Sequence, residues 1–225
     1  MATPANYLPS VEIEPSTSAT ATVIWMHGLG ADGHDFEPIV PHLAIPETVS
    51  IRFIFPHAPS IPVTINNGTV MPAWYDILNL NFEHSANEVQ LRASAEAIGL
   101  LIDREVERGI DSQRIIIVGF SQGGAVGYEL ALTYPLRLGG LIAISTYFAT
   151  QNSIAATSAN QNLPILICHG QHDPMVPEIH GQTSHRRLLE MGYAVEYRTY
   201  PVQHNVDMRE VAEIGTWITE RLLKS

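Results

Sequence analysis

The sequence predicts an α/β fold in which helices cover both faces of a mostly parallel central sheet. Short apolar runs typical of buried strands alternate with longer segments in which apolar residues recur at helical spacing. Neither an internal repeat nor a long linker interrupts this alternation. A chain of 225 residues can bury a sizeable core as one domain. We therefore expect residues 1–225 to form a single domain.

The strands are predicted by β-type or apolar runs that end in glycine-rich or polar segments. These runs lie at residues 21–26, just before His57, and at 114–118, 164–168 and 194–200. Amphipathic helices are expected over residues 88–108, around His180 and His185, and at the C-terminus.

The helix predicted at residues 88–108 carries one apolar stripe, which we assign to the core. Its apolar residues recur every three to four positions, and Ser85 with Glu88 forms a capping-box pattern at its start. The stripe consists of Leu91, Ala95, Ile98, Ile102 and Val106.

A G-x-S-x-G motif lies between the strand at residues 114–118 and a helical segment from Ala125. This is the context of a nucleophile elbow, a tight turn that projects a serine hydroxyl above the sheet. The motif alone is weak, because glycine and serine are also common in plain turns. Ser121 becomes a candidate nucleophile only if the chain also supplies a base, an orienting carboxylate and oxyanion donors.

The base and the carboxylate are sought downstream of Ser121, in loops that follow strands. Asp173 lies in the loop expected after the strand at residues 164–168. His204 follows the last predicted strand and precedes the closing helix. Other histidines also follow strand-like runs, but His204 alone combines that position with the order serine, aspartate, histidine.

The oxyanion hole requires two backbone N–H groups. The residue after the nucleophile, Gln122, supplies one. Leu29 supplies the second, because Gly28 and Gly30 flank it after an early strand and allow its amide to turn inward. The alternative is that the two glycines serve only the turn.

Five motifs together resemble the family of small α/β-hydrolases that contains carboxylesterases, lysophospholipases and acyl-protein thioesterases. They lie at residues 25–32, 71–77, 119–124, 169–177 and 200–204. Residues 145–147 are more similar to the bacterial carboxylesterase branch than to the eukaryotic thioesterases. One departure is Gln203, where the family usually has glycine before the histidine; Asn205 follows that histidine.

The resemblance implies an α/β-hydrolase fold and a serine hydrolase that cleaves carboxylic esters with short to medium acyl chains and needs no cofactor or metal. Thioester or lysophospholipid cleavage is the alternative, and a homodimer is left open. Residue by residue, it implies Ser121, Asp173 and His204 as the triad and the Leu29 and Gln122 amides as oxyanion donors. Two rivals are a zinc hydrolase using His169, His172 and Asp173, which lacks a nearby further ligand, and a non-catalytic binding module.

Residues 56–82 are predicted to form a long, proline-interrupted loop that by resemblance covers the acyl-binding cleft. Trp74 either lines this cleft or packs beneath the loop. Leu78 and Leu80 are expected in the lining. The full set of substrate-binding candidates is Trp74, Leu78, Leu80, Phe82, Met175 and Val176.

Charge and composition restrict the partners and the compartment. Twelve basic against 23 acidic residues give a net charge of −11, which disfavours nucleic acids and anionic membrane surfaces. The single cysteine, Cys168, excludes an internal disulfide and suits a reducing cytoplasm. Residues 1–20 lack the features of a signal peptide, and no apolar run is long enough to span a membrane. We expect an unexported cytoplasmic protein.

Overall fold

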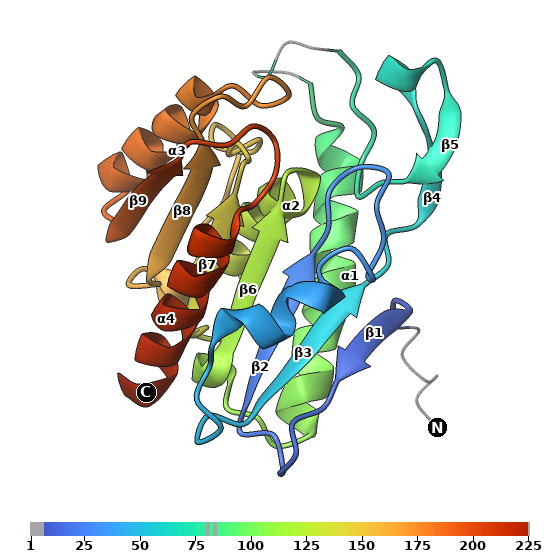
Figure 1. The fold of residues 1–225 in the computed structure, drawn as a ribbon. Coiled ribbons are helices and arrows are strands. Elements are labelled where there is room, and N and C mark those ends of the chain that lie inside the picture. The colour runs from blue at the N-terminus through green and yellow to red at the C-terminus, as the bar shows by residue number, and fades with distance from the viewer. Residues whose placement is uncertain (1–6, 80–81, 83–84, 225) are drawn as a thin grey trace.

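The computed structural model describes residues 7–79, 82 and 85–224. Its centre is a seven-stranded sheet with strand order β1-β3-β2-β6-β7-β8-β9, in which only β1 runs antiparallel to its neighbour β3 (Figure 1). The strands are β1 (Ser10–Ile13), β2 (Ala21–Met26), β3 (Ile51–Pro56), β6 (Ile115–Phe120), β7 (Gly140–Ile144), β8 (Ile165–Gly170) and β9 (Val195–Tyr200).

Helices cover both faces of the sheet, as predicted (Figure 1). One face packs against α1, α2 and α3, and the other against α4 and the short helix η1. The helices are η1 (Glu37–Leu43), η2 (Thr64–Asn66), α1 (Glu88–Glu107), η3 (Ser112–Arg114), α2 (Gln122–Thr133), η4 (Ser158–Asn160), α3 (Glu178–Glu190) and α4 (Met208–Lys224). None of the helices in the described part of the chain is long and apolar enough to cross a membrane.

The central strands are buried on both faces because their apolar residues are nearly continuous. In β6, Ile115 and Ile117 face the core under α1 and α2, whereas Ile116 and Val118 face the core under α4. The parallel pairing of β2 with β6 sets Trp25 opposite Val118. All parallel strands therefore end at one edge of the sheet, where the loops that carry the candidate residues meet.

Helix α1 buries the predicted stripe, with Val106 only partly buried, but the predicted capping box is wrong. Asn87 is the N-cap, and its side chain accepts a hydrogen bond from the N–H of Gln90. The Ser85 hydroxyl instead lies against the hydroxyl of Tyr147. Both Ser85 and Asn87 are residue types that favour the N-cap, and the tertiary contact of Ser85 decides between them.

The segment at residues 56–82 is not one irregular loop. Its first part forms a two-stranded antiparallel ribbon of β4 (Ser60–Val63) and β5 (Thr69–Pro72), seen at the upper right of Figure 1. Pro62 and Pro72 fit in this ribbon because each strand has one unpaired edge, where the missing N–H is not needed. The chain from Ala73 onward then returns across the end of the sheet.

Helix α4 carries a buried carboxyl group, that of Glu210. It is only 1% exposed, and its Oε1 has no hydrogen-bond partner among the described residues. Burial, reinforced by the nearby charge of Asp207, raises the pKa of Glu210 to about 8 from the usual 4.5. Folded protein thus retains a proton that the unfolded chain releases between these two values.

Glu210→Gln should therefore change how stability depends on pH. The contribution of Glu210 is fully present below about pH 4.5 and is lost as pH rises through about 8, since ionising the buried group is costly. Relative to wild type, the unfolding free energy of Glu210→Gln should rise by on the order of 4 kcal/mol across this window. Urea unfolding near pH 5 and pH 9 measures it, with the exposed Glu47→Gln as control. If the difference in unfolding free energy between Glu210→Gln and wild type were the same at pH 5 and pH 9, the raised pKa of Glu210 would be contradicted.

Candidate active site

Ser121 lies on a strained turn between β6 and α2. Its backbone has φ 54° and ψ −120°, a region that residues other than glycine rarely adopt. The Ser121 N–H donates to the carbonyl of Ile144 at 2.9 Å, and the Thr146 hydroxyl donates to the Ser121 carbonyl at 2.6 Å. Contacts with the end of β7 thus hold the strained conformation in place.

The glycines around Ser121 are required by close backbone approach. A Cβ atom on Gly119 would lie 2.2 Å from the carbonyl oxygen of Gly123. One on Gly123 would lie 2.6 Å from the carbonyl oxygen of Met26 on β2. Strand β6 and helix α2 can therefore meet at this angle only without side chains at both positions.

His204 and Asp173 form a hydrogen-bonded chain with Ser121. The Nε2 atom of His204 lies 3.0 Å from the Ser121 hydroxyl oxygen, and its Nδ1 atom lies 2.6 Å from Oδ2 of Asp173. The ring of Phe120 packs against the imidazole, with ring centroids 4.8 Å apart. This chain can transfer the serine proton to an imidazole that a carboxylate orients.

The Asp173 carboxyl group is held as an anion. Burial acts to raise its pKa, but the hydrogen bond from His204 and those from the N–H groups of Val176 and Met175 outweigh it, so the net pKa is lowered. Both N–H groups donate to Oδ1 at 2.8 Å, which leaves Oδ2 directed at His204. The carboxylate is therefore ionised and fixed in orientation.

His169 lies inside β8, which extends two residues beyond the predicted strand. Its Nε2 lies 2.8 Å from the carbonyl oxygen of Val176, and burial lowers its pKa, so it is a neutral ring that donates to this carbonyl. His172 is exposed on the loop that follows. The part of the chain that the structure describes contains no group of three or more His, Cys, Asp or Glu side chains arranged to hold a metal ion.

The departure at Gln203 does not strain the loop before His204. Gln203 and Asn205 are exposed, and neither has a positive φ. Backbone atoms of Gln203 instead pack against Gly170, where an added Cβ would lie 2.2 Å from the Gln203 carbonyl oxygen. Close approach at this point thus depends on Gly170 and not on the residue at position 203.

The loop after β2 carries Leu29, one of the two predicted oxyanion donors. Neither the Leu29 N–H nor the Gln122 N–H donates to any described residue, and both residues line the same cavity as Ser121. Buried His27 fixes this loop: its Nδ1 lies 2.7 Å from the carbonyl oxygen of Gly28, and its Nε2 accepts from the N–H of Ala58. Burial lowers the pKa of His27, which agrees with a neutral ring in this arrangement.

Trp74 is fully buried and does not line the cavity. Its indole N–H donates to the carbonyl of His27, and its backbone N–H donates to the side-chain carbonyl of Gln122. The side-chain amide of Gln122 in turn donates to the carbonyl of Tyr75. Of the two alternatives for Trp74, packing beneath the segment fits the structure, and the residue links the two loops that carry the predicted oxyanion donors.

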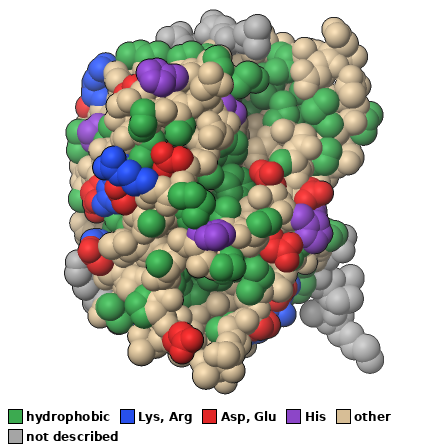
Figure 2. Space-filling model, viewed as in Figure 1, with side chains coloured by type: hydrophobic (Ala, Val, Ile, Leu, Met, Phe, Trp, Pro, Cys, Tyr) green, Lys and Arg blue, Asp and Glu red, His purple; other side chains and the backbone are tan. Residues whose placement is uncertain are grey.

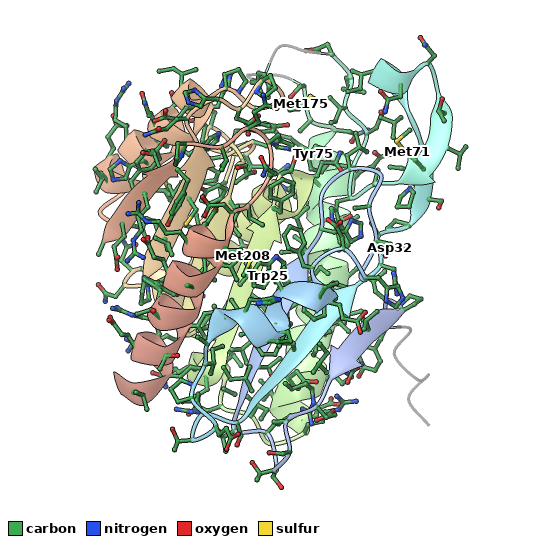
Figure 3. All side chains as sticks on the ribbon, viewed as in Figure 1. Trp25, Asp32, Met71, Tyr75, Met175 and Met208 are labelled. Carbon is green, nitrogen blue, oxygen red and sulfur yellow. The ribbon has the colours of Figure 1, made fainter. Side chains whose placement is uncertain are left out.

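A largely apolar cavity of about 350 Å³ opens at Ser121. Figure 2 shows this face of the molecule hollowed, with hydrophobic side chains along the hollow. Tyr75 and Met175 lie above the carboxyl ends of the strands in Figure 3. The lining includes Gly28, Leu29, Ala31, Asp35, Ile65, Tyr75, Ile77, Asn79, Phe82, Ser85, Phe120, Ser121, Gln122, Tyr147, Met175, Val176 and His204.

Three of the predicted substrate-binding residues line this cavity, namely Phe82, Met175 and Val176. Leu78 is not among the residues that line the cavity, and it is 46% exposed to solvent. Leu80 lies outside the described residues. The alternation of backbone direction after Tyr75 explains the outcome, since Ile77 points into the cavity where Leu78 points away.

A parallel sheet with helices on both faces and a serine on a strained strand-to-helix turn defines an α/β-hydrolase. The model of the family described as Phospholipase/Carboxylesterase matches residues 9–222. The chain belongs to this family, and it is a serine hydrolase. The alternative of a non-catalytic binding module is not supported.

Known relatives are similar over nearly the whole chain. Acyl-protein thioesterase 1 of Neurospora crassa is 38% identical over 216 residues, which cover 91% of this chain and 88% of the relative. The crystal structure of SOBER1 from Arabidopsis thaliana has a TM-score of 0.83 and 32% identity, and covers 90% of this chain and 99% of that chain. Acyl-protein thioesterase 2 of Zea mays has a TM-score of 0.81 and 27% identity, over 96% of this chain and 100% of that chain.

Proposed function

We propose that this enzyme hydrolyses carboxylic esters through an acyl-enzyme on Ser121. The serine oxygen attacks the ester carbonyl carbon while Nε2 of His204 takes its proton. The N–H groups of Leu29 and Gln122 stabilise the resulting oxyanion. The imidazolium then gives the proton to the leaving alcohol, and water, activated by the same histidine, releases the acid. Asp173 holds the imidazole in the required tautomer.

One observation carries this proposal: the Ser121 hydroxyl, His204 and Asp173 are joined by contacts of 3.0 and 2.6 Å at the opening of an apolar cavity. Two N–H groups without an acceptor among the described residues line the same cavity. A nucleophile, its base, an orienting carboxylate and oxyanion donors are the parts that acyl transfer needs.

The substrate class is proposed from the cavity. Its volume and apolar lining suit a short to medium acyl chain, including the acyl chain of a lipid ester. Thioester cleavage is the second candidate, because relatives in Neurospora crassa and Zea mays are named acyl-protein thioesterases. Both reactions use the same attack on an acyl carbon and differ in the leaving group.

Labelling with a fluorophosphonate tests the mechanism, and a substrate panel tests the class. The probe should modify Ser121 and no other residue, as located by peptide mass spectrometry, and EDTA should leave ester hydrolysis unchanged. Nitrophenyl esters of graded length, acyl-thioesters and a lysophospholipid should rank the three activities by kcat/KM. Labelling elsewhere would refute the nucleophile, and loss of activity with EDTA would favour a zinc hydrolase.

We also propose a cytoplasmic location, supported by the single cysteine, Cys168, which is buried and unpaired. The net charge of −11 supports a small-molecule substrate over nucleic acid. A homodimer, implied by the resemblance, would be detected by light scattering during gel filtration. Recovery of the protein in a secreted or membrane fraction would contradict the location.

A further inference from the structure

Three hydroxyl groups meet in the wall of the cavity, and we call them the hydroxyl cluster. The Tyr75 hydroxyl lies 3.2 Å from the Tyr147 hydroxyl, which lies 3.1 Å from the Ser85 hydroxyl. All three side chains are buried, and all three line the cavity that contains Ser121. The remaining wall is largely apolar, with Ile77 among its residues.

The hydroxyl cluster is fixed to the same backbone that shapes the elbow. The Tyr75 carbonyl accepts a hydrogen bond from the Gln122 side chain at 2.8 Å. Tyr147 directly follows Thr146, whose hydroxyl donates to the Ser121 carbonyl. Both tyrosine rings therefore extend from segments bonded to the elbow, so a chain attached to Ser121 reaches the cluster within one rigid site.

The hydrogen-bond count leaves the cluster with an unused donor. Three hydroxyls supply three protons, and the two contacts between them use two. The third proton has no acceptor among the described residues. Burial and the neighbouring Tyr147 raise the pKa of Tyr75, so its hydroxyl keeps its proton. A buried donor without an acceptor in an apolar wall is unfavourable, and a ligand oxygen would satisfy it.

Aromatic rings pack directly beside the hydroxyl cluster. The ring of Phe82 packs edge-on against Tyr147, with centroids 5.2 Å apart, and it also contacts the ring of His180. The wall that an acyl chain would meet around the cluster is thus largely apolar, and the hydroxyls form a polar point within it. A wall of this kind favours acyl chains that carry an oxygen atom opposite the hydroxyl cluster over acyl chains that do not.

We propose that the hydroxyl cluster of Tyr75, Tyr147 and Ser85 binds an oxygen substituent on the acyl chain, so that hydroxyacyl or ketoacyl esters are preferred over hydrocarbon chains of equal length. The proposal rests on the proposed acyl-enzyme at Ser121, which keeps the acyl group in this cavity. A substituent oxygen accepts the unused proton, and a substituent hydroxyl also donates to a free lone pair of the cluster. A methylene at the same place leaves the donor unsatisfied.

The test compares nitrophenyl esters of one chain length, unsubstituted or carrying a hydroxyl or keto group at successive carbons. With the leaving group constant, differences in kcat/KM report the acyl chain. At one position the wild-type enzyme should prefer the substituted ester by about ten-fold or more. Tyr75→Phe and Tyr147→Phe remove only the hydroxyl oxygen, and each should lower this preference to about two-fold or less.

A matched control is Tyr193→Phe, which removes a buried tyrosine hydroxyl that has no partner among the described residues and lies outside the cavity lining. It should keep the wild-type preference. The proposal would be overturned if wild type showed no preference for a substituted ester at any position, or if the preference survived in both Tyr75→Phe and Tyr147→Phe. It would also be overturned if both variants lost kcat/KM equally for all esters and had a lower Tm, because the hydroxyl groups would then serve only to stabilise the fold. Fluorophosphonate labelling of Ser121 in the same samples shows separately whether the proposed nucleophile holds.

Discussion

Replacing Ser121 with alanine is expected to lower kcat for ester hydrolysis by about three orders of magnitude or more. The variant keeps the cavity, the oxyanion donors and the His204–Asp173 pair, but it lacks the atom that forms the acyl-enzyme. Circular dichroism should be unchanged, because the side chain is small and its hydroxyl contacts His204 rather than the backbone of the elbow. Steady-state kinetics on a nitrophenyl ester in excess over the folded variant measures the loss.

The stability of Ser121→Ala should fall little, since positive φ is equally unfavourable for serine and alanine. A matched control is Ser153→Ala, a serine outside the cavity that should retain full activity. Retention of wild-type turnover in pure, folded Ser121→Ala would remove the serine from the mechanism and with it the proposed acyl-enzyme.

The elements that could be predicted from the sequence are those fixed by local pattern. The apolar runs of β2, β6 and β8 are long enough to identify buried strands, and the glycines at positions 119 and 123 identify the sharp turn at Ser121. Asp173 and His204 could be proposed from their order, their spacing and their positions in loops after strands, because parallel strands bring their following loops to one edge.

The hairpin within residues 56–82 is not among the predicted elements, although a local signal for it exists. Asn67 and Gly68 both adopt positive φ in the turn between β4 and β5, a combination that an Asn-Gly pair favours. The prolines at positions 62 and 72 obscure it, since proline usually argues against a strand. Their tolerance depends on unpaired strand edges, which is a property of the tertiary structure.

The hydroxyl cluster could not be predicted, because its members are distant in sequence. Tyr75 and Tyr147 are 72 residues apart, and Ser85 is 62 residues from Tyr147. No periodicity or motif relates the three segments. The pattern at Ser85 even predicts a different partner, a helix cap, so only the packed structure identifies the hydroxyl that it contacts.

The remaining large effect concerns the carboxylate that orients His204. Asp173→Asn should lower kcat by up to about 10⁴, the loss typical of the corresponding change in serine proteases, because an amide opposite Nδ1 favours the tautomer that cannot accept the serine proton. Asp76 and Asp207 are matched controls near the site, since Asp76 accepts from the backbone N–H of Thr64 and Asp207 accepts from that of Glu210. Their asparagine variants should lose far less activity. Kinetics with folded variants decides the matter, and a greater loss in either control than in Asp173→Asn would transfer the orienting role to that residue.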